Sequence, residues 1–243
     1  MIRDLTRRGR KLFKLLANPI YRRGLRSGTA AAVEHEVAIR PLRVNTVIDI
    51  GANTGQFSLV VRALFPSVTI HAFEPLLSSA CSYISLFATQ ENTFLHAVAA
   101  GAVECVSEIN VSRRRDSSSL LPISDMQSNI FPGTQQQCVE RIQVVRVDDV
   151  LASKELVKPI LVKLDVQGFE KVALSGMPLI LDQATFVYAE ISFIELYSGQ
   201  VLASELISWL STRGFYLKGV FNLTVTTAGE PVQADALFVR AAA

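Results

Sequence analysis

The amino-acid sequence predicts an α/β protein built around a doubly wound sheet, and three observations support that prediction. Short runs of β-branched and other apolar residues alternate with segments of helical spacing along most of the 243-residue chain. Hydrophobic residues make up 49% of the chain and charged residues 19%, unlike a disordered, collagen-like or coiled-coil chain. No window reaches the roughly 18 apolar residues of a membrane-spanning helix, so the apolar excess suits a sheet buried on both faces.

The N-terminal part of the chain differs in charge from the rest. Residues 1–43 hold eleven Lys or Arg and three Asp or Glu, a net charge of +8, whereas residues 44–243 carry −6. We therefore expect a basic helical arm over 1–43 and a single main domain over 44–243. An amphipathic helix is expected over 2–20, with its apolar positions at Ile2, Leu5, Leu12, Phe13, Leu16 and Ile20. A secretory signal is not expected, because the apolar stretch breaks at Asn18-Pro19.

Two roles for this arm remain open. Residues 1–26 would lie on an anionic membrane surface with their apolar side down, or the helix would pack on the acidic body as an N-terminal cover. A nucleic-acid partner is not expected, since such binders are usually basic across their main face. The isolated thiols of Cys81, Cys105 and Cys138 favour a reducing compartment, and so a cytoplasmic protein. The sequence leaves the oligomeric state open.

Strands and helices are expected to alternate regularly in the first half of the main domain. Its strands are runs of Val, Ile, Thr and Phe that stop at Gly or Glu-Pro, and its helices space apolar residues three or four apart. The elements expected are a strand over 44–50, a helix over 56–65, a strand over 68–73, a helix over 78–88, and strands over 93–99 and 105–111.

A polar segment then interrupts the alternation. Residues 112–139 contain runs of Arg, Ser and Gln, two Pro and a Gly, which favours an insertion or lid loop that lines a binding pocket. The remaining elements expected are strands over 142–147, 159–164 and 184–191, helices over 168–174 and 202–212, and a final hairpin pair over 215–220 and 234–239.

A glycine-rich turn follows the first expected strand. Asp49 precedes Gly51, Asn53 and Gly55 in the sequence DIGANTG, where the glycines allow a tight turn and close approach of a ligand to the backbone. The free N–H groups of the next helix favour an anionic group such as a carboxylate. The pattern is GxNxG and not the GxGxxG of dinucleotide-binding proteins, because Asn replaces the glycine that makes room for pyrophosphate. An ordinary glycine turn is the alternative.

Glu74 extends this site to a nucleoside. It ends the second strand, where a carboxylate accepts hydrogen bonds from the two hydroxyls of a ribose and would repel a 2′-phosphate. A surface acid before a proline turn is the alternative. Together the turn and Glu74 indicate a nucleoside with a free ribose and a small carboxylate, a description that S-adenosylmethionine fits.

Four segments, in order, resemble those of the FkbM-type methyltransferases. They read VIDIGANTGQFS, HAFEP, VKLDVQGFE and YAEIS, and the resemblance runs from about Thr46 to Arg240. The resemblance implies an S-adenosylmethionine-dependent O-methyltransferase that acts on hydroxyls of natural products or of sugars, including those of glycolipids. It also implies a Rossmann-like class I methyltransferase fold, with a seven-stranded, mostly parallel sheet and an antiparallel C-terminal strand. Two positions depart from the family pattern: Gln167 stands where Glu is common, and Phe169 where a small residue is common.

The reaction implied is methyl transfer from a sulfonium to a hydroxyl, for which the enzyme aligns the two atoms and excludes water. A positioned base would help to remove the hydroxyl proton. Asp165 ends a main strand at the edge where ligands bind, so it is the first candidate for base or acceptor anchor. Glu190 ends the next strand and is the second candidate. The alternatives are that Asp165 caps the helix over 168–174 and that Glu190 is a strand-end acid in an ion pair.

The remaining candidates are less specific. His96 closes the third strand beside the expected adenine site, and we expect a structural role or a cofactor contact rather than a base. We predict no metal site; the alternative is a Mg²⁺ site formed by Asp148, Asp149 and Asp165. Buried Lys163 needs a carboxylate partner, for which Glu190 or Asp165 could serve.

Two other classes of function stay open on the sequence alone. An NAD-dependent oxidoreductase would share the fold and Glu74, yet the chain lacks GxGxxG and an obvious Tyr/Lys or Cys/His pair. A non-catalytic nucleoside-binding protein at a membrane surface would suit the basic arm.

Overall fold

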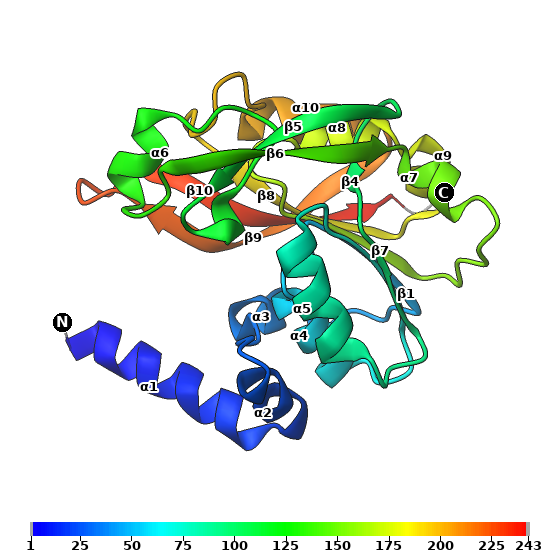
Figure 1. Cartoon of the computed structure of the whole chain (residues 1–243), viewed down its shortest axis with the longest axis horizontal. Coiled ribbons are helices and arrows are strands. Elements are labelled where there is room, and N and C mark those ends of the chain that lie inside the picture. Colours follow the sequence, from blue (N-terminus) through cyan, green and yellow to red (C-terminus); the bar gives the residue numbers. More distant parts are fainter. Residues whose placement is uncertain (1, 242–243) are drawn as a thin grey trace.

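A central sheet and the helices on its two faces make up most of the molecule (Figure 1). The computed structural model describes the backbone of residues 2–241 and the side chains of residue 9 and residues 11–241. Within that part of the chain the sheet has seven strands in the order β3-β2-β1-β7-β8-β10-β9. The strands are β1 (Thr46–Ile50), β2 (Thr69–Phe73), β3 (Thr93–His96), β7 (Ile160–Leu164), β8 (Phe186–Ser192), β9 (Phe215–Val225) and β10 (Pro231–Arg240). Only β10 runs against its neighbours in these residues, so the predicted seven-stranded sheet with an antiparallel C-terminal strand is confirmed.

The middle strands are buried along their whole length because helices cover both faces of the sheet. One core packs the sheet against α4 (Gln56–Leu64) and α5 (Leu77–Phe87) together with the N-terminal segment. The other core packs it against four C-terminal helices. These are α7 (Val147–Leu151), α8 (Glu170–Ser175), α9 (Pro178–Gln183) and α10 (Ala203–Ser211).

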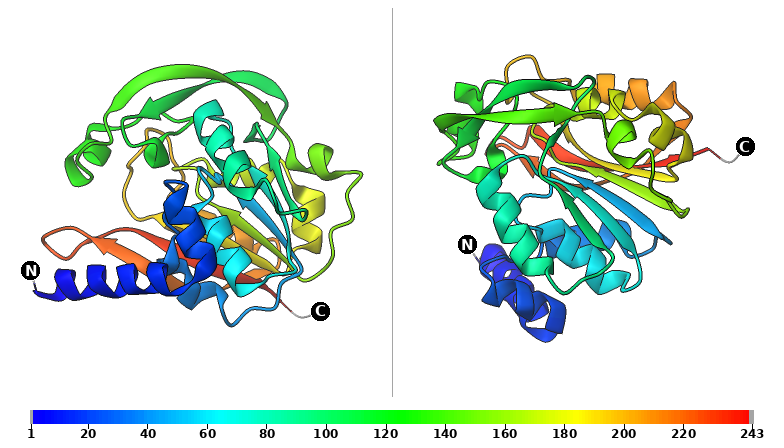
Figure 2. Two further views of the ribbon diagram at one scale, coloured as in Figure 1. Left: turned by 60° about the horizontal axis from the view of Figure 1, so that its bottom comes forward. Right: turned by 45° about the vertical axis from the view of Figure 1, so that its right-hand side comes forward.

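A second, three-stranded sheet arches over one end of the molecule (Figure 2). Its order is β4-β6-β5, with β4 at Ala99–Ala100, β5 at Cys105–Ser112 and β6 at Gln136–Val145. The sequence predicts β5 and part of β6 as strands but does not separate them from the main sheet. The single strand expected over 93–99 is wrong, because the chain leaves the main sheet after His96 and β4 joins the second sheet.

The segment expected as an insertion or lid loop is more regular than predicted. It contains the 3-10 turn η2 (Arg115–Ser117) and the helix α6 (Asp125–Ile130), and its last residues already belong to β6. At the other end of β6, the strand expected over 142–147 stops early, because α7 begins at Val147. Buried Tyr197 borders η2, and its hydroxyl oxygen lies 3.0 Å from the Ser117 carbonyl oxygen.

The N-terminal segment forms two helices instead of the single helix expected over 2–20. The first, α1 (Ile2–Ala17), ends at Asn18, and α2 (Pro19–Arg26) begins there. The Asn18 side chain accepts a hydrogen bond from the Ile20 N–H at 2.8 Å, and proline occupies the first helical position, so this residue pair starts a new helix. A 3-10 turn η1 (Val33–His35) and α3 (Glu36–Ile39) then lead to β1.

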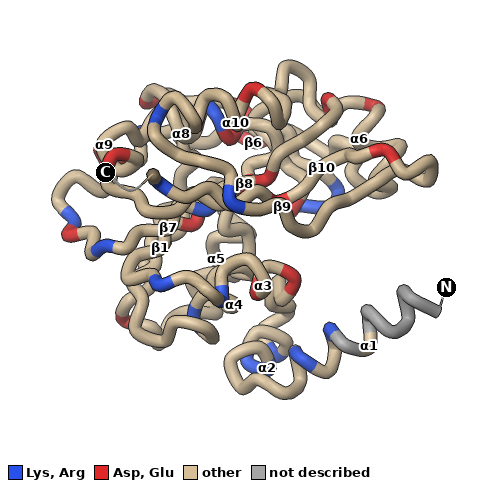
Figure 3. The backbone as a smooth tube through the Cα atoms, turned by 180° about the vertical axis from the view of Figure 1, so that it is seen from behind, with Lys and Arg blue, Asp and Glu red and all other residues tan. Residues whose placement is uncertain are grey.

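Two side chains of the α1–α2 segment belong to the core. Leu15 and Tyr21 are buried, and the Tyr21 hydroxyl donates to the buried Glu36 carboxylate at 2.9 Å. Arg23 donates to the Leu86 carbonyl on α5 at 2.7 Å. By contrast, Leu12, Phe13 and Leu16 are exposed. Figure 3 shows basic residues on α2 and on the described end of α1. Ile2 and Leu5, which the sequence places on the apolar face of the helix, have side chains outside the described part of the chain.

Candidate active site

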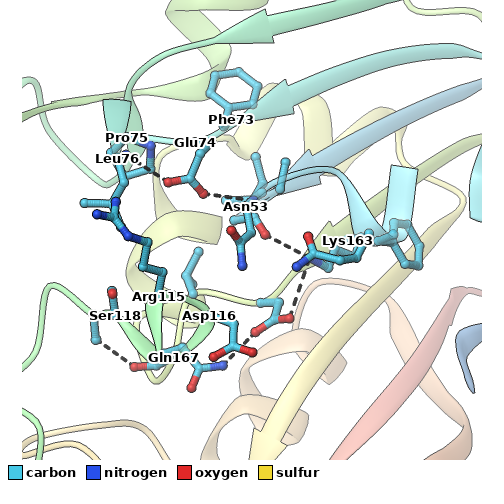
Figure 4. Close-up of a pocket in the computed structure, with 18 of the residues that line it drawn as sticks. Asn53, Phe73, Glu74, Pro75, Leu76, Arg115, Asp116, Ser118, Lys163 and Gln167 are labelled. Atoms are coloured by element: carbon cyan, nitrogen blue, oxygen red, sulfur yellow. Dashed lines mark hydrogen bonds and ion pairs between the residues drawn. The ribbon is translucent and has the colours of Figure 1, made fainter. Parts of the chain in front are cut away.

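A cavity of about 280 Å³ opens at the carboxyl ends of β1, β2 and β7 (Figure 4). The lining comes mainly from the turn after β1 with the start of α4, the end of β2, the segment before β1, the η2 region and the turn after β7. Lys11 of α1 and residues of β4 and β5 complete it. Ligands of open α/β sheets bind at this edge of the sheet. Gly51, Asn53, Glu74 and Asp165 line the cavity, so the structure brings together four of the residues that the sequence singles out.

The glycine turn owes its shape to its two glycines. Gly51 has φ +76°, and an added Cβ would lie 2.0 Å from the Asp165 carbonyl oxygen. Gly55 has φ +99° and precedes α4, where an added Cβ would lie 2.6 Å from the Phe87 ring. Gly55 does not itself line the cavity. Both positions need glycine because a side chain meets both a strained backbone and a close neighbour.

Asn53 and Glu74 form the cavity wall on the β2 side. The Asn53 N–H donates to Glu74 Oε2 at 2.9 Å, and the Leu76 N–H donates to Oε1 at 2.8 Å. Burial raises the pKa of Glu74 to about 7, although these two bonds oppose the shift. Asn53 has φ 48°, and its buried side-chain oxygen has no hydrogen-bond partner in the part of the chain described here. This corner therefore presents acceptor oxygens to a ligand that carries N–H or O–H donors.

A buried ion pair supports the floor of the turn. Lys163 Nζ lies 3.2 Å from Asp49 Oδ1, 3.1 Å from the Gly51 carbonyl oxygen and 3.8 Å from Asp165 Oδ2. Burial lowers the pKa of Lys163, but the neighbouring carboxylates outweigh this effect and the pKa is raised. Its nearest carboxylate is thus Asp49, which the sequence does not single out as its partner, and Asp165, one of the two acids named from the sequence, is a second and more distant partner. Asp49 is fully buried and does not line the cavity, so it acts on the turn from below.

The two candidate catalytic carboxylates are joined by Gln167. Its amide nitrogen donates to Asp165 Oδ1 at 2.7 Å and to Glu190 Oε2 at 3.1 Å, while its oxygen accepts from the Tyr197 hydroxyl at 2.6 Å. Asp165 is 39% exposed at the side chain and lines the cavity, whereas Glu190 is half-buried and does not line it. Burial, and then the charge of Asp165, raise the pKa of Glu190 well above its ordinary value. Asp165 is therefore the carboxylate within reach of a ligand.

The helix-capping role considered for Asp165 is wrong, because α8, among the described residues, has no side-chain hydrogen bond at its N-cap, Phe169. Glu170, the first residue of α8, instead accepts from the Val166 N–H at 3.1 Å and from the Gly168 N–H at 3.2 Å, both in the turn before the helix. Asp165 is left free to face the cavity.

Three other candidates lie away from the cavity lining. His96 stacks on Phe73 with ring centroids 4.6 Å apart, and its Nε2 lies 3.4 Å from His71 Nδ1. Asp148 accepts from two backbone N–H groups at the start of α9, at 2.9 and 3.0 Å, and Asp149 pairs with Arg146. Across residues 2–241 as described, no group of three or more His, Cys, Asp or Glu side chains has a metal-binding arrangement.

One residue that lines the cavity, His35, is not predicted as a site residue from the sequence. His35 lines the cavity from the segment before β1, which the sequence predicts only as part of a basic arm. Its Nδ1 lies 3.0 Å from the Tyr188 hydroxyl and 3.3 Å from Asp235 Oδ2. The only signal in the sequence that could have pointed to His35 is its residue type, because the chain has three histidines.

The strand order, the glycine turn and the acid that ends β2 together define a Rossmann-like methyltransferase. Residues 49–217 match the model of the methyltransferase FkbM domain, and the chain belongs to that family. The family and fold predictions are therefore confirmed, and S-adenosylmethionine is the methyl donor of this class of enzyme. The unpartnered acceptor of Asn53 beside the Glu74 carboxylate suits that cofactor, which carries an ammonium group and a ribose diol.

Known proteins resemble this chain to different degrees. The 31-O-demethyl-FK506 methyltransferase FkbM of Streptomyces tacrolimicus is 27% identical over 174 residues, which cover 60% of this chain and 63% of that protein. Among solved structures, Aeropyrum pernix fibrillarin with bound S-adenosyl-L-methionine gives a TM-score of 0.49 at 10% identity, covering 88% of this chain and 74% of that one. TehB of Haemophilus influenzae gives 0.47 at 11% identity, covering 88% and 63%.

Proposed function

We propose that this methyltransferase transfers a methyl group from S-adenosylmethionine to a hydroxyl, in a sugar of a glycolipid or of another glycosylated natural product. The observation that carries the proposal is one cavity lined by the glycine turn, Glu74 and Asp165. The relative from S. tacrolimicus is named for methylation of an oxygen of a natural product, which supports a hydroxyl acceptor. Family membership favours this reaction over hydride transfer and over a purely binding role.

The cofactor would lie across the glycine turn toward β2. Glu74 accepts hydrogen bonds from the ribose hydroxyls, and Asn53 accepts one from the ammonium group. Asp49 and Lys163 act from below by holding the turn in shape. Bound S-adenosylmethionine supplies an activated methyl group, so the protein has to align the acceptor oxygen and exclude water.

The acceptor would enter from the side of the 115–120 segment, which lines the cavity next to Gln167. Asp165 anchors its hydroxyl by accepting a hydrogen bond. Glu190 lies beneath and acts through Gln167, whose amide holds Asp165 in one orientation. Gln167 has φ 54°, a strained conformation for a residue other than glycine, which is typical of functional sites.

The reaction is tested by offering the full-length protein a panel of hydroxyl acceptors with S-adenosylmethionine. Methyl glycosides, glycolipid extracts and 31-O-demethyl-FK506 would be compared by mass spectrometry with and without the protein. We expect one acceptor class to gain a methyl group on oxygen. Methylation on nitrogen or carbon only, or of no acceptor while the cofactor is bound, would contradict the proposal.

The pH dependence of cofactor binding offers a separate check on Glu74. Only the ionised carboxylate of Glu74 can accept hydrogen bonds from both ribose hydroxyls, so the cofactor should bind more tightly when Glu74 is ionised. With a pKa of about 7, affinity for S-adenosylhomocysteine should fall by about ten-fold from pH 8 to pH 6, because each pH unit below the pKa costs about 1.4 kcal/mol. Lys163 lowers this pKa slightly and Asp49 raises it. Calorimetric titration of the wild type and of Glu74→Gln should show this slope in the wild type alone; equal slopes would assign the effect elsewhere.

We retain a cytoplasmic location and a peripheral membrane contact as part of the proposal. Among the helices of the described residues, none is long and apolar enough to cross a bilayer. The exposed Leu12, Phe13 and Leu16 lie on α1 near basic residues, an arrangement that favours an anionic interface. Buried Leu15 on α1 and Tyr21 on α2 support the N-terminal cover as well, so the two roles can be divided between the exposed and the buried faces of the segment.

A triple variant separates these roles. Leu12→Ser, Phe13→Ser and Leu16→Ser together should reduce co-sedimentation with phosphatidylglycerol vesicles at low salt by several-fold. Stability should stay within about 0.5 kcal/mol per substitution, because these side chains are exposed. Leu179→Ser, which replaces an exposed leucine on α9, is the matched control and should bind like the wild type. Equal vesicle binding by both variants would count against a membrane role for α1.

A further inference from the structure

His35 has the setting of a general base, although it lies outside every motif of the family resemblance. Its side chain is 15% exposed and lines the same cavity as Lys163 and Asp165. The Phe57 ring and the imidazole meet edge to face with centroids 5.6 Å apart, and Lys163 Nζ lies over the Phe57 ring at 5.5 Å from its centroid. The imidazole therefore belongs to the wall of the cavity.

All contacts that the structure gives His35 with polar side chains meet the ring at one nitrogen. Nδ1 lies 3.3 Å from Asp235 Oδ2, 3.0 Å from the Tyr188 hydroxyl and 3.4 Å from the Asn222 amide nitrogen. The opposite edge, with Nε2, has no hydrogen-bond partner among the described side chains. Since His35 lines the cavity and its Nδ1 is engaged, Nε2 is the ring nitrogen available to a ligand there.

The partners of Asp235 fix which nitrogen carries the proton. Asn222 donates to Asp235 Oδ2 at 2.7 Å, and the nearby Tyr188 hydroxyl helps to lower the pKa of this carboxylate. Burial alone raises the pKa of Asp235, but the bond from His35 and those from its other two partners outweigh burial and lower it. A carboxylate that stays ionised attracts a donor, so Nδ1 carries the hydrogen and Nε2 keeps its lone pair.

We propose that His35, oriented by Asp235, is the general base that takes the proton of the acceptor hydroxyl during methyl transfer. This inference rests on the proposed function. A carboxylate behind Nδ1–H and a free Nε2 is the arrangement by which serine hydrolases hold a histidine as a base. Histidine is also the residue most often used to move protons near neutral pH. Asp165 then keeps the anchoring role, because it is already engaged by Gln167.

The step balances without a further reactant. The acceptor oxygen forms a bond to the methyl carbon as the carbon–sulfur bond breaks, and the electron pair of that bond stays on sulfur. The hydroxyl proton passes to Nε2 of His35, and the imidazolium is stabilised by Asp235. Release of that proton to water restores the base for the next turnover.

The first test reads the tautomer and needs no acceptor. The chain has three histidines, so ¹⁵N-histidine labelling of the full-length protein and long-range ¹H–¹⁵N spectra resolve each ring, with His35→Asn assigning its signals. We expect His35 in the Nδ1–H form and a shift toward Nε2–H in Asp235→Asn. A wild-type His35 with its hydrogen on Nε2 would overturn the proposal.

The second test reads catalysis with an acceptor found by the panel above. His35→Asn keeps an amide donor toward Asp235 and removes Nε2, so it should fold and bind S-adenosylmethionine as the wild type does. Its kcat should fall by about 10²–10⁴. In His35→Ala, added imidazole should restore turnover in a saturable way, whereas Asp165→Asn should gain nothing from imidazole. Retention of kcat within a few-fold in His35→Asn would assign the ring a structural role only.

The proposed function and the role of His35 would be contradicted by different results. If the wild type methylates no hydroxyl, the proposed function is wrong, and the wild-type reaction shows this before any variant is compared. If the wild type is active and His35→Asn is too, only the role of His35 is wrong.

Discussion

Gly51→Ala should eliminate measurable binding of S-adenosylmethionine and destabilise the protein. The added Cβ meets two obstacles: a left-handed backbone with φ +76° and the Asp165 carbonyl oxygen at 2.0 Å. The backbone conformation costs about 1–2 kcal/mol for a residue with a Cβ, and the crowding adds about 1–3 kcal/mol. Together this is a large share of the roughly 5–15 kcal/mol that stabilises a folded domain. Relief of the clash moves either the cofactor turn or the end of β7, and both line the cavity.

A matched glycine separates the two obstacles. Gly28 has φ +79°, yet an added Cβ there meets no atom within 4 Å. Gly28→Ala should therefore show the backbone cost of about 1–2 kcal/mol in denaturant unfolding and keep its cofactor affinity. If Gly51→Ala binds the cofactor as tightly as Gly28→Ala does, the turn is not the cofactor site.

Asp165→Asn should lower kcat/KM for the acceptor by about 10–100-fold and leave cofactor affinity within about two-fold. The substitution keeps the shape of the side chain and removes its charge. Loss of a charge-assisted hydrogen bond costs about 1.5–3 kcal/mol, which corresponds to that fall in kcat/KM. A general base contributes about 10²–10⁴ to the rate. A fall in kcat/KM of more than about 10³ in Asp165→Asn would therefore identify Asp165, and not His35, as the general base.

Steady-state kinetics with Asp149→Asn provides the control for Asp165→Asn. Asp149 is an exposed carboxylate outside the cavity, with Arg146 as its ion-pair partner. It should leave kcat/KM unchanged. The anchoring role of Asp165 fails if its Asn variant behaves in the same way.

The parts of the fold predicted correctly depend on local patterns. β1, β2 and β7 are short runs of apolar residues that end at Gly51, Glu74 and Asp165. Parallel strands end at one edge of the sheet, so the alternation of strands and helices is enough to predict that these three residues lie close together. The side-chain contacts at this edge could not be predicted from the sequence. The nearest carboxylate to Lys163 is Asp49, which lies on the neighbouring strand in register with it.

The parts that were predicted incorrectly depend on pairings between distant residues. β5 and β6 read as strands, but periodicity does not say which sheet a strand joins, and their mutual pairing places them outside the main sheet. His35 and Asp235 lie at opposite ends of the chain, so no local pattern links them. The break at Asn18-Pro19 could have been predicted, because Asn before Pro is typical of a helix start.

Calorimetric titration of S-adenosylmethionine into the wild type and Glu74→Ala tests most directly whether this cavity is the cofactor site. We predict one cofactor per chain in the wild type and an affinity at least about ten-fold lower in the variant, because a charge-assisted acceptor for the ribose is lost. Glu74→Gln, which keeps one acceptor for the Asn53 or Leu76 N–H, should fall between them. Equal dissociation constants in the wild type and Glu74→Ala, or no binding to the wild type, would contradict the assignment.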